Sequence, residues 1–182
     1  MENNTNESTP LINKNNISLS TINKDWAGQL VLSSCPEINK EYKSLSFQKL
    51  IATFKDDNIS LVVTLLDTIE VTRLDISTLG KFLKENNIYW EHFPIQDLRI
   101  PTERNLLIKL LVHMKKLLDD DKSVLIHCYA GLGRTGLLAT TLLVSLGLEA
   151  KVSIEHIRKI RPGSIETIEQ ENFVKQWDFR FK

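Results

Sequence analysis

The sequence predicts an α/β fold in which a central, mostly parallel sheet of four to five strands carries helices on both faces. Short apolar runs alternate with segments whose apolar residues recur three and four positions apart, so strands and helices follow one another along the chain. Residues 59–66 form the clearest strand, because they are almost entirely apolar and rich in β-branched side chains, as strands buried on both faces are.

The composition indicates one globular domain and argues against several classes of protein. The chain has 182 residues, of which 42% are hydrophobic, and single domains usually hold about 100–200 residues. Its 23 basic and 23 acidic residues cancel, unlike the basic excess of nucleic-acid-binding proteins. Two cysteines, Cys35 and Cys128, cannot form a disulfide framework. Because no apolar run approaches the ~20 residues of a membrane span and the first residues lack a signal peptide, we expect a soluble, cytoplasmic monomer.

The N-terminal segment differs in composition from the rest of the chain. Residues 1–24 hold seven Asn and few large apolar side chains. Such a segment cannot bury enough apolar surface to offset the entropy lost on ordering. We therefore expect a disordered tail over residues 1–24 and a single domain over residues 25–182.

The first half of this domain is predicted to alternate strands with helices. Residues 30–32 form a short strand that ends at a turn before Pro36. Apolar residues then recur on one face of a helix: Phe47, Leu50, Ile51 and Phe54. The strand at 59–66 follows, and after it come a short helix over 77–85 and a strand over 88–93.

A loop and a long helix begin the second half. Pro94 and Pro101 bracket the loop, which contains Asp97. Thr102 is expected to cap the helix, whose apolar residues form one stripe: Leu107, Leu110, Leu111, Met114, Leu117 and Leu118.

The last strand and three helices complete the domain. They are expected at 123–127 for the strand and at 135–146, 151–160 and 167–177 for the helices. Thr167 and Gln170 have the spacing of a capping box at the start of the last helix.

One segment has the features of a phosphate-binding loop. Between the last strand and the next helix the chain reads His127-Cys128-Tyr129-Ala130-Gly131-Leu132-Gly133-Arg134-Thr135-Gly136. Five residues between Cys128 and Arg134 can form a tight loop whose backbone N–H groups converge on one anion, and the glycines allow the dihedral angles that this needs. The following helix adds its N-terminal dipole, and the Arg134 guanidinium can bind two phosphate oxygens.

The same groups make Cys128 a candidate nucleophile. Backbone N–H groups, a helix dipole and an arginine all favour the thiolate, which is the reactive form of cysteine. The alternative is a structural cysteine buried beside a glycine turn, but this leaves Arg134 without a function. Cys35 is expected to be a small apolar residue of a turn or, alternatively, a redox partner of Cys128.

The segment resembles the HC-x5-R-[ST] signature of the cysteine-based protein phosphatases, above all small atypical dual-specificity phosphatases and the kinase-associated phosphatase. The resemblance covers about residues 28–178, and it includes Asp67 and Glu70, the loop around Asp97 and the segment 161–167. It implies a fold like that of dual-specificity phosphatases and hydrolysis of phosphoric monoesters with no metal and no cofactor.

The resemblance also implies roles for individual residues. Cys128 would attack phosphorus and form a phosphocysteine, and Asp97 would protonate the leaving oxygen and then deprotonate the hydrolytic water. Thr135 would hydrogen-bond the thiolate, and His127 would orient the loop. The phosphate would be bound by Arg134 together with the loop interior: Tyr129, Ala130, Gly131, Leu132 and Gly133.

Two of these assignments have alternatives in the sequence. Asp97 could be an ordinary loop residue, in which case Glu91 in a strand and Glu103 at a helix start are the other candidate acids. His127 could simply pack at the end of its strand.

The chain departs from the family pattern at one position. Many relatives carry Gln-Thr-x-x-Gln before the last helix, with the first Gln positioning the hydrolytic water, whereas this chain reads Glu166-Thr167-Ile168-Glu169-Gln170. A carboxylate that faces a bound phosphate is electrostatically unfavourable. Glu166 is therefore expected either to be protonated or to turn away, for example toward Arg161. In a functional role it would accept a hydrogen bond from the hydrolytic water or deprotonate it. It could also serve only its own helix dipole. Glu166 and Gln170 are supporting candidates.

The expected substrate is a phosphorylated protein. The loop interior has no lysine, whereas related lipid phosphatases tend to place lysines there, so polyphosphoinositides are disfavoured. No motif that would deepen the pocket for phosphotyrosine alone is evident, so we expect phosphotyrosine and phosphoserine or phosphothreonine to be accepted. The alternatives are a catalytically weak phosphate-binding module, a phosphatase of inositol phosphates or lipids, and an enzyme of the sulfurtransferase or arsenate-reductase type.

Overall fold

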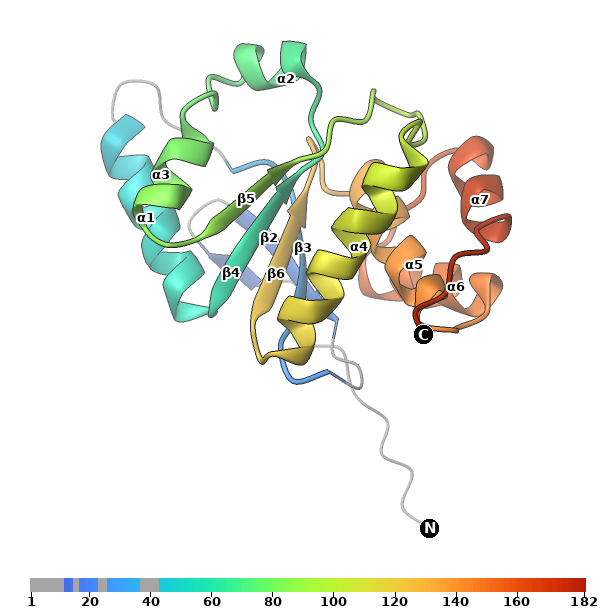
Figure 1. The fold of residues 1–182 in the computed structure, drawn as a ribbon. Coiled ribbons are helices and arrows are strands. Elements are labelled where there is room, and N and C mark those ends of the chain that lie inside the picture. The colour runs from blue at the N-terminus through green and yellow to red at the C-terminus, as the bar shows by residue number, and fades with distance from the viewer. Residues whose placement is uncertain (1–11, 15–16, 23–25, 37–42) are drawn as a thin grey trace.

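The computed structural model describes residues 12–14, 17–22, 26–36 and 43–182, and within these ranges six strands form one sheet in the order β1-β2-β3-β6-β4-β5 (Figure 1). Four neighbouring strands are parallel: β3 (Leu30–Ser33), β6 (Ser123–His127), β4 (Ile59–Thr64) and β5 (Tyr89–His92). The predicted α/β fold with a mostly parallel sheet is confirmed.

The other two strands lie in the segment that the sequence predicts to be disordered. β1 (Ile12–Lys14) pairs antiparallel with β2 (Ile17–Ile22), and β2 pairs antiparallel with β3. The expectation of a disordered tail over 1–24 is therefore wrong for these strands, while its other residues lie outside the described ranges. The physical reason is the edge of β3, whose backbone N–H and C=O groups gain partners, together with the burial of Ile22 in the core.

Helices cover both faces of the sheet. α1 (Lys43–Asp56) and α3 (Leu79–Glu85) cover one face, and the other face carries α4 (Arg104–Asp119), α5 (Gly133–Ser145), α6 (Ala150–Ile160) and α7 (Ile168–Lys175) (Figure 1). Successive residues of β4 point to opposite faces. Val62 belongs to the apolar cluster of Phe47 in α1, whereas Leu61 and Val63 belong to the cluster of Leu111 in α4.

α4 and α5 begin at residues other than those predicted. Thr102 does not cap α4, because its carbonyl instead accepts the N–H of Arg104 (3.2 Å) and Glu103 occupies the N-cap position. α5 begins at Gly133, since the loop that starts at Cys128 turns directly into the helix. No helix in the described part of the chain is long and apolar enough to cross a membrane.

Two helices begin with side-chain caps. α2 (Thr68–Arg73) is too short to show helical periodicity, and it starts with a reciprocal capping box between Asp67 and Glu70. Thr167 caps α7 as predicted, because its Oγ1 accepts the N–H of Gln170 (3.1 Å). The Gln170 side chain does not complete the capping box and binds other backbone groups.

Candidate active site

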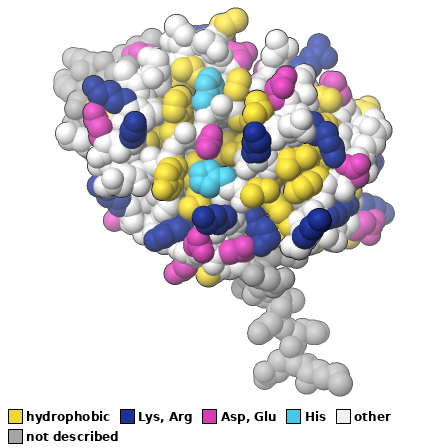
Figure 2. Space-filling view, in the orientation of Figure 1, with side chains coloured by type: hydrophobic (Ala, Val, Ile, Leu, Met, Phe, Trp, Pro, Cys, Tyr) yellow, Lys and Arg dark blue, Asp and Glu magenta, His cyan; other side chains and the backbone are white. Residues whose placement is uncertain are grey.

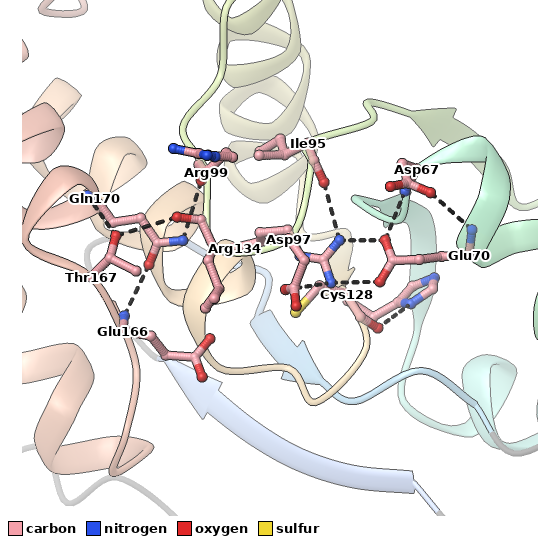
Figure 3. A network of polar contacts seen from close by, with 12 residues as sticks. Asp67, Glu70, Ile95, Asp97, Arg99, Cys128, Arg134, Glu166, Thr167 and Gln170 are labelled. Carbon is pink, nitrogen blue, oxygen red and sulfur yellow. Dashed lines mark hydrogen bonds and ion pairs between the residues drawn. The ribbon is translucent and has the colours of Figure 1, made fainter.

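The predicted site residues meet at the carboxyl ends of the parallel strands, where α/β sheets commonly bind ligands. β6 leads directly into Cys128, and α5 begins five residues later at Gly133. The segment after β4 supplies Glu70, and the segment after β5 supplies Asp97. Figure 3 shows Cys128, Asp97 and Arg134 in one cluster.

The loop from Cys128 to Gly133 packs against the end of strand β3, and Arg161 binds it through hydrogen bonds. Gly131 has φ +73°, and a Cβ there would lie 2.2 Å from the carbonyl oxygen of Ser33, so only glycine fits. Arg161 is buried, and its Nε and Nη2 donate to the carbonyls of Gly131 (2.6 Å) and Ala130 (3.1 Å). Because Arg161 binds these carbonyl oxygens, they point away from the inside of the loop. The backbone N–H groups of the loop are then available to bind an anion. The sequence does not predict this role of Arg161.

Arg134 is fixed in place by a carboxylate. The residue is only 2% exposed. Its Nη1 and Nη2 donate to the two carboxylate oxygens of Glu70 (2.5 and 2.9 Å), and Nη1 also donates to the carbonyl of Ile95 (3.0 Å). The resemblance includes Glu70 but gives it no role, and the only signal in the sequence is its spacing from Asp67 after a buried strand. The structure makes Glu70 the partner that orients Arg134.

Both members of this ion pair are charged at neutral pH. Burial alone would raise the pKa of Glu70, but the hydrogen bonds from Arg134 and from the Asp67 N–H bring it below the ordinary glutamate value. Burial alone would lower the pKa of Arg134, but Glu70 raises it above the ordinary value, and Cys128 and Asp97 add to the rise. Arg134 therefore stays a cation in the pocket.

Asp97 lies beside the guanidinium. Its Oδ1 is 3.1 Å from Nη2 of Arg134, and its side chain is 66% exposed. Of the alternative acids, Glu91 lies on β5 and pairs with His113 (3.4 Å), and Glu103 stands at the start of α4. The structure thus brings Asp97 to Arg134 and gives Glu91 a different partner.

His127 is connected to the core by a chain of hydrogen bonds. The indole N–H of Trp90 donates to Thr64 Oγ1 (2.9 Å), which lies 2.8 Å from His127 Nε2, while Nδ1 lies 3.2 Å from the carbonyl of Cys128. The pKa of His127 is lowered to about 4, chiefly by burial; the hydrogen bond to the Cys128 carbonyl acts to raise it, and His92 and Arg134 act to lower it. The ring is therefore neutral, with Nε2 accepting from Thr64 and Nδ1–H donating to Cys128.

Thr135 is buried at the start of α5. Its Oγ1 is one of four buried side-chain polar atoms that have no hydrogen-bond partner among the described residues. An unpaired buried hydroxyl costs about 1–3 kcal/mol. This hydroxyl is free to donate to a ligand or to the Cys128 sulfur.

Glu166 and Gln170 lie on the other side of the pocket from Glu70 (Figure 3). The Glu166 side chain lies against Gly133, because a Cβ on this glycine would be only 2.1 Å from Glu166 Oε2. It therefore approaches the start of α5. Gln170 is fully buried, and its Oε1 accepts the N–H of Glu166 (2.9 Å) while its Nε2 donates to the carbonyl of Arg99 (3.2 Å). Gln170 joins the segment around Glu166 to the loop of Asp97.

Cys35 is the second cysteine near the site. Its N–H donates to the carbonyl of Tyr129 (2.8 Å). Burial raises the pKa of the Cys35 thiol to about 12, and the nearby Cys128 and Glu70 contribute to the rise. Both cysteines are free, and Cys35 is a protonated thiol at neutral pH.

Comparison with known proteins identifies the family. A family model described as "Polymorphic toxin system, DSP-PTPase phosphatase" matches residues 38–148, which is more than half of the chain. The chain belongs to this phosphatase family. The description of this family is that of phosphatases, the enzymes that hydrolyse phosphoric monoesters.

Individual relatives agree with this assignment. Cyclin-dependent kinase inhibitor 3 of Rattus norvegicus is 27% identical over 135 residues, which are 72% of this chain and 63% of that protein, so the match spans less than two thirds of it. "Probable protein tyrosine phosphatase type IVA A" of Dictyostelium discoideum is 31% identical over 133 residues, 70% of this chain and 79% of that protein.

Solved structures show the same fold. Kinase associated phosphatase, crystallised with serine in place of its catalytic-site cysteine, superposes with a TM-score of 0.75 at 22% identity over 92% of this chain and 94% of that one. The active form of the phosphatase Tk-PTP has a TM-score of 0.67 at 26% identity over 82% and 91% of the two chains.

Proposed function

We propose that the chain hydrolyses phosphotyrosine and phosphoserine or phosphothreonine in proteins through a phosphocysteine intermediate. The observation that carries this proposal is the buried Arg134, held by Glu70 and 3.1 Å from the Asp97 carboxylate, at the loop that begins with Cys128. Phosphoryl transfer to a side chain needs three groups close together. These are a nucleophile, a cation that binds the phosphoryl oxygens, and an acid that donates a proton to the leaving group.

In the first step, the Cys128 thiolate attacks phosphorus. An S–P bond forms, and the P–O bond to the substrate side chain breaks. Protonated Asp97 gives its proton to the leaving oxygen, which departs as a phenol or an alcohol. The loop N–H groups and Arg134 balance the charge of the remaining phosphoryl oxygens.

In the second step, water attacks the phosphorus of the phosphocysteine. Asp97 takes a proton from the water, the S–P bond breaks, and phosphate and the Cys128 thiolate are released. The unpaired hydroxyl of Thr135 donates to the departing sulfur. Glu166, against Gly133, accepts a hydrogen bond from the attacking water in place of the glutamine of many relatives.

The substrate class is tested by comparing three kinds of phosphate ester. Purified chain is assayed with p-nitrophenyl phosphate, with phosphotyrosine and phosphothreonine peptides of one sequence, and with a short-chain phosphoinositide, each with and without vanadate. We expect vanadate-sensitive hydrolysis of both peptides and no turnover by the Cys128→Ser variant. Hydrolysis of the phosphoinositide alone would contradict the protein substrate, and the absence of any turnover by the wild-type chain would indicate a phosphate-binding module.

A further inference from the structure

Exposed apolar side chains are concentrated in the segments that build the pocket. Eight large hydrophobic side chains are strongly exposed among the described residues, and four belong to these segments: Ile69, Leu98, Tyr129 and Ile168. The other four belong to β5, α4 and α6. Figure 2 shows hydrophobic and charged side chains next to one another on one face of the molecule. Such a mixture is normal for a protein surface.

Two of the four form an apolar pair on the α2 side of the pocket, here called the α2 pair: Ile69 and Tyr129. Ile69 directly precedes Glu70, the partner of Arg134, and Tyr129 directly follows Cys128. Arg73 lies one helical turn after Ile69, on the same face of α2, and its guanidinium stands 6.0 Å from the centre of the Tyr129 ring. Ile69 and Tyr129 thus flank one arginine.

The other two form an apolar pair on the opposite side, here called the α7 pair: Leu98 and Ile168. Leu98 directly follows Asp97, and its carbonyl accepts the hydroxyl of Thr167 (3.4 Å), the residue before Ile168. Leu98 has φ +61°, and it remains 50% exposed. Ile168 is 81% exposed although it begins a helix with a buried face.

The candidate site lies between the segments that carry the two pairs. In Figure 3, Cys128, Asp97 and Arg134 stand between Glu70 on the α2 side and Thr167 on the α7 side. The inference requires a polypeptide that runs from the α2 side to the α7 side while its phosphorylated side chain lies in the site. The residues before and after the phosphorylated one come to lie beside the α2 pair and the α7 pair.

We propose that the two pairs bind apolar side chains of the substrate, so that the preferred substrate is a polypeptide segment with apolar residues on both sides of the phosphorylated residue. This inference rests on the proposed function and adds a sequence preference to it. Exposed apolar groups gain stabilisation when a ligand removes them from water, and apolar pockets discriminate between substrates by about 10–200-fold.

The charges around the pocket favour a peptide over a membrane surface. Asp67, Glu166 and Glu169 lie in the segments that carry the two pairs, and Glu169 pairs with Arg99 (3.6 Å). Anionic lipid surfaces attract clusters of unpaired basic residues. Arg73 beside the α2 pair and Arg99, which pairs with Glu169, are accompanied by these carboxylates, so the segments that carry the two pairs present no cluster of unpaired basic residues for such a surface.

The test uses matched phosphotyrosine peptides that differ only in their flanks. One peptide carries Leu on both sides of the phosphotyrosine, and the other carries Ser. We expect the wild-type kcat/KM for the Leu peptide to exceed that for the Ser peptide about tenfold or more. In Ile69→Ser and Ile168→Ser, this ratio should fall toward one. Val152→Ser removes an exposed apolar side chain from α6, and it should keep the wild-type ratio.

The possible results separate this inference from the proposed function. Equal hydrolysis of both peptides by the wild-type chain, or an unchanged ratio in both Ile variants, would overturn the apolar preference and leave the phosphatase activity intact. Hydrolysis of p-nitrophenyl phosphate without hydrolysis of either peptide would overturn the protein substrate itself. Faster turnover of a phosphoinositide in vesicles than of the Leu peptide, lost in the Ile variants, would assign the two pairs to a membrane instead.

Discussion

Single residues determine how Arg134, the proposed phosphate-binding arginine, is positioned. The Arg134 side chain is buried, and a buried cation needs a charged partner, because an unpaired one costs several kcal/mol. Glu70 supplies this partner with both carboxylate oxygens, and the Asp67 N–H donates to the same carboxylate (3.0 Å). The position of the guanidinium therefore depends on a short helix 64 residues away in sequence.

Removing the Glu70 charge should impair phosphate binding. In Glu70→Gln, the side-chain amide cannot accept two hydrogen bonds from Arg134, so we expect kcat/KM for p-nitrophenyl phosphate to fall about 10–100-fold, as for other displaced catalytic groups. Asp67→Asn is the matched control, because its side-chain oxygen can still accept the Glu70 N–H (2.8 Å). A wild-type kcat/KM in Glu70→Gln would show that Arg134 needs no carboxylate.

Asp97 should matter most for substrates with poor leaving groups. We expect Asp97→Asn to lower kcat for phosphotyrosine by about 10²–10⁴-fold, the usual contribution of general acid catalysis. The loss should be smaller for an aryl phosphate whose leaving group needs no proton, and Glu91→Gln should lose little with either substrate. Equal losses for both substrates would mean that Asp97 is not the acid.

At the scale of elements, α7 holds the loop that carries Asp97. Its first turn contacts the loop three times: Thr167 donates to the Leu98 carbonyl, Gln170 donates to the Arg99 carbonyl, and Glu169 pairs with the Arg99 side chain. Gln170 is buried, so its hydrogen bond to the Arg99 carbonyl lies on the side of the loop that faces the core. The helix thus limits the motion of the loop next to Asp97.

Loss of the Gln170 contacts should release this loop. In Gln170→Leu, the Arg99 carbonyl and the Glu166 N–H both lose a partner. We expect kcat for phosphotyrosine to fall about tenfold or more while the affinity for vanadate, which the 128–134 loop binds, stays unchanged. Asn172→Ala, an exposed position on the same helix, serves as the control. An equal loss of vanadate affinity would show that Gln170 supports the whole site and not the acid loop.

Local sequence patterns predicted the parallel strands and the loop from Cys128 to Arg134, and the family resemblance added Asp97. Three of the parallel strands, β3, β4 and β6, are mostly apolar, whereas β5 is largely exposed, and the loop motif is contiguous in the chain. β1 and β2 could not be predicted, because they depend on the open edge of β3. The contacts of Arg161 with the loop and of Gln170 with the Arg99 carbonyl join residues 31 and 71 positions apart, so they depend on tertiary packing.

At the scale of the whole molecule, the buried His127 connects stability to pH. Its pKa is about 4 in the folded chain, below the ordinary 6.5, so the unfolded chain binds a proton that the folded chain does not between these values. Stability therefore falls as pH falls from 6.5 to 4, by about 3 kcal/mol for this one group. Glu70 acts in the same direction at lower pH, because its folded pKa also lies below the unfolded value.

The pH dependence can be measured by urea unfolding at pH 7, 5.5 and 4. We expect the free energy of unfolding of the wild-type chain to fall over this range and that of His127→Asn to fall less steeply, because the substituted side chain does not titrate. His113→Asn, a half-exposed histidine on α4, should keep the wild-type slope. Parallel slopes for the wild-type chain and His127→Asn would show that His127 does not carry the effect.

The covalent step can be observed directly by rapid acid quenching. The chain is mixed with a ³²P-labelled phosphotyrosine peptide and quenched within the first turnover, and the label on the protein is located by peptide mapping. The account predicts covalent label on the peptide that contains Cys128, none in Cys128→Ser, and less than about 1% of the wild-type kcat in that variant. Label on another residue, or substantial turnover by Cys128→Ser, would contradict it.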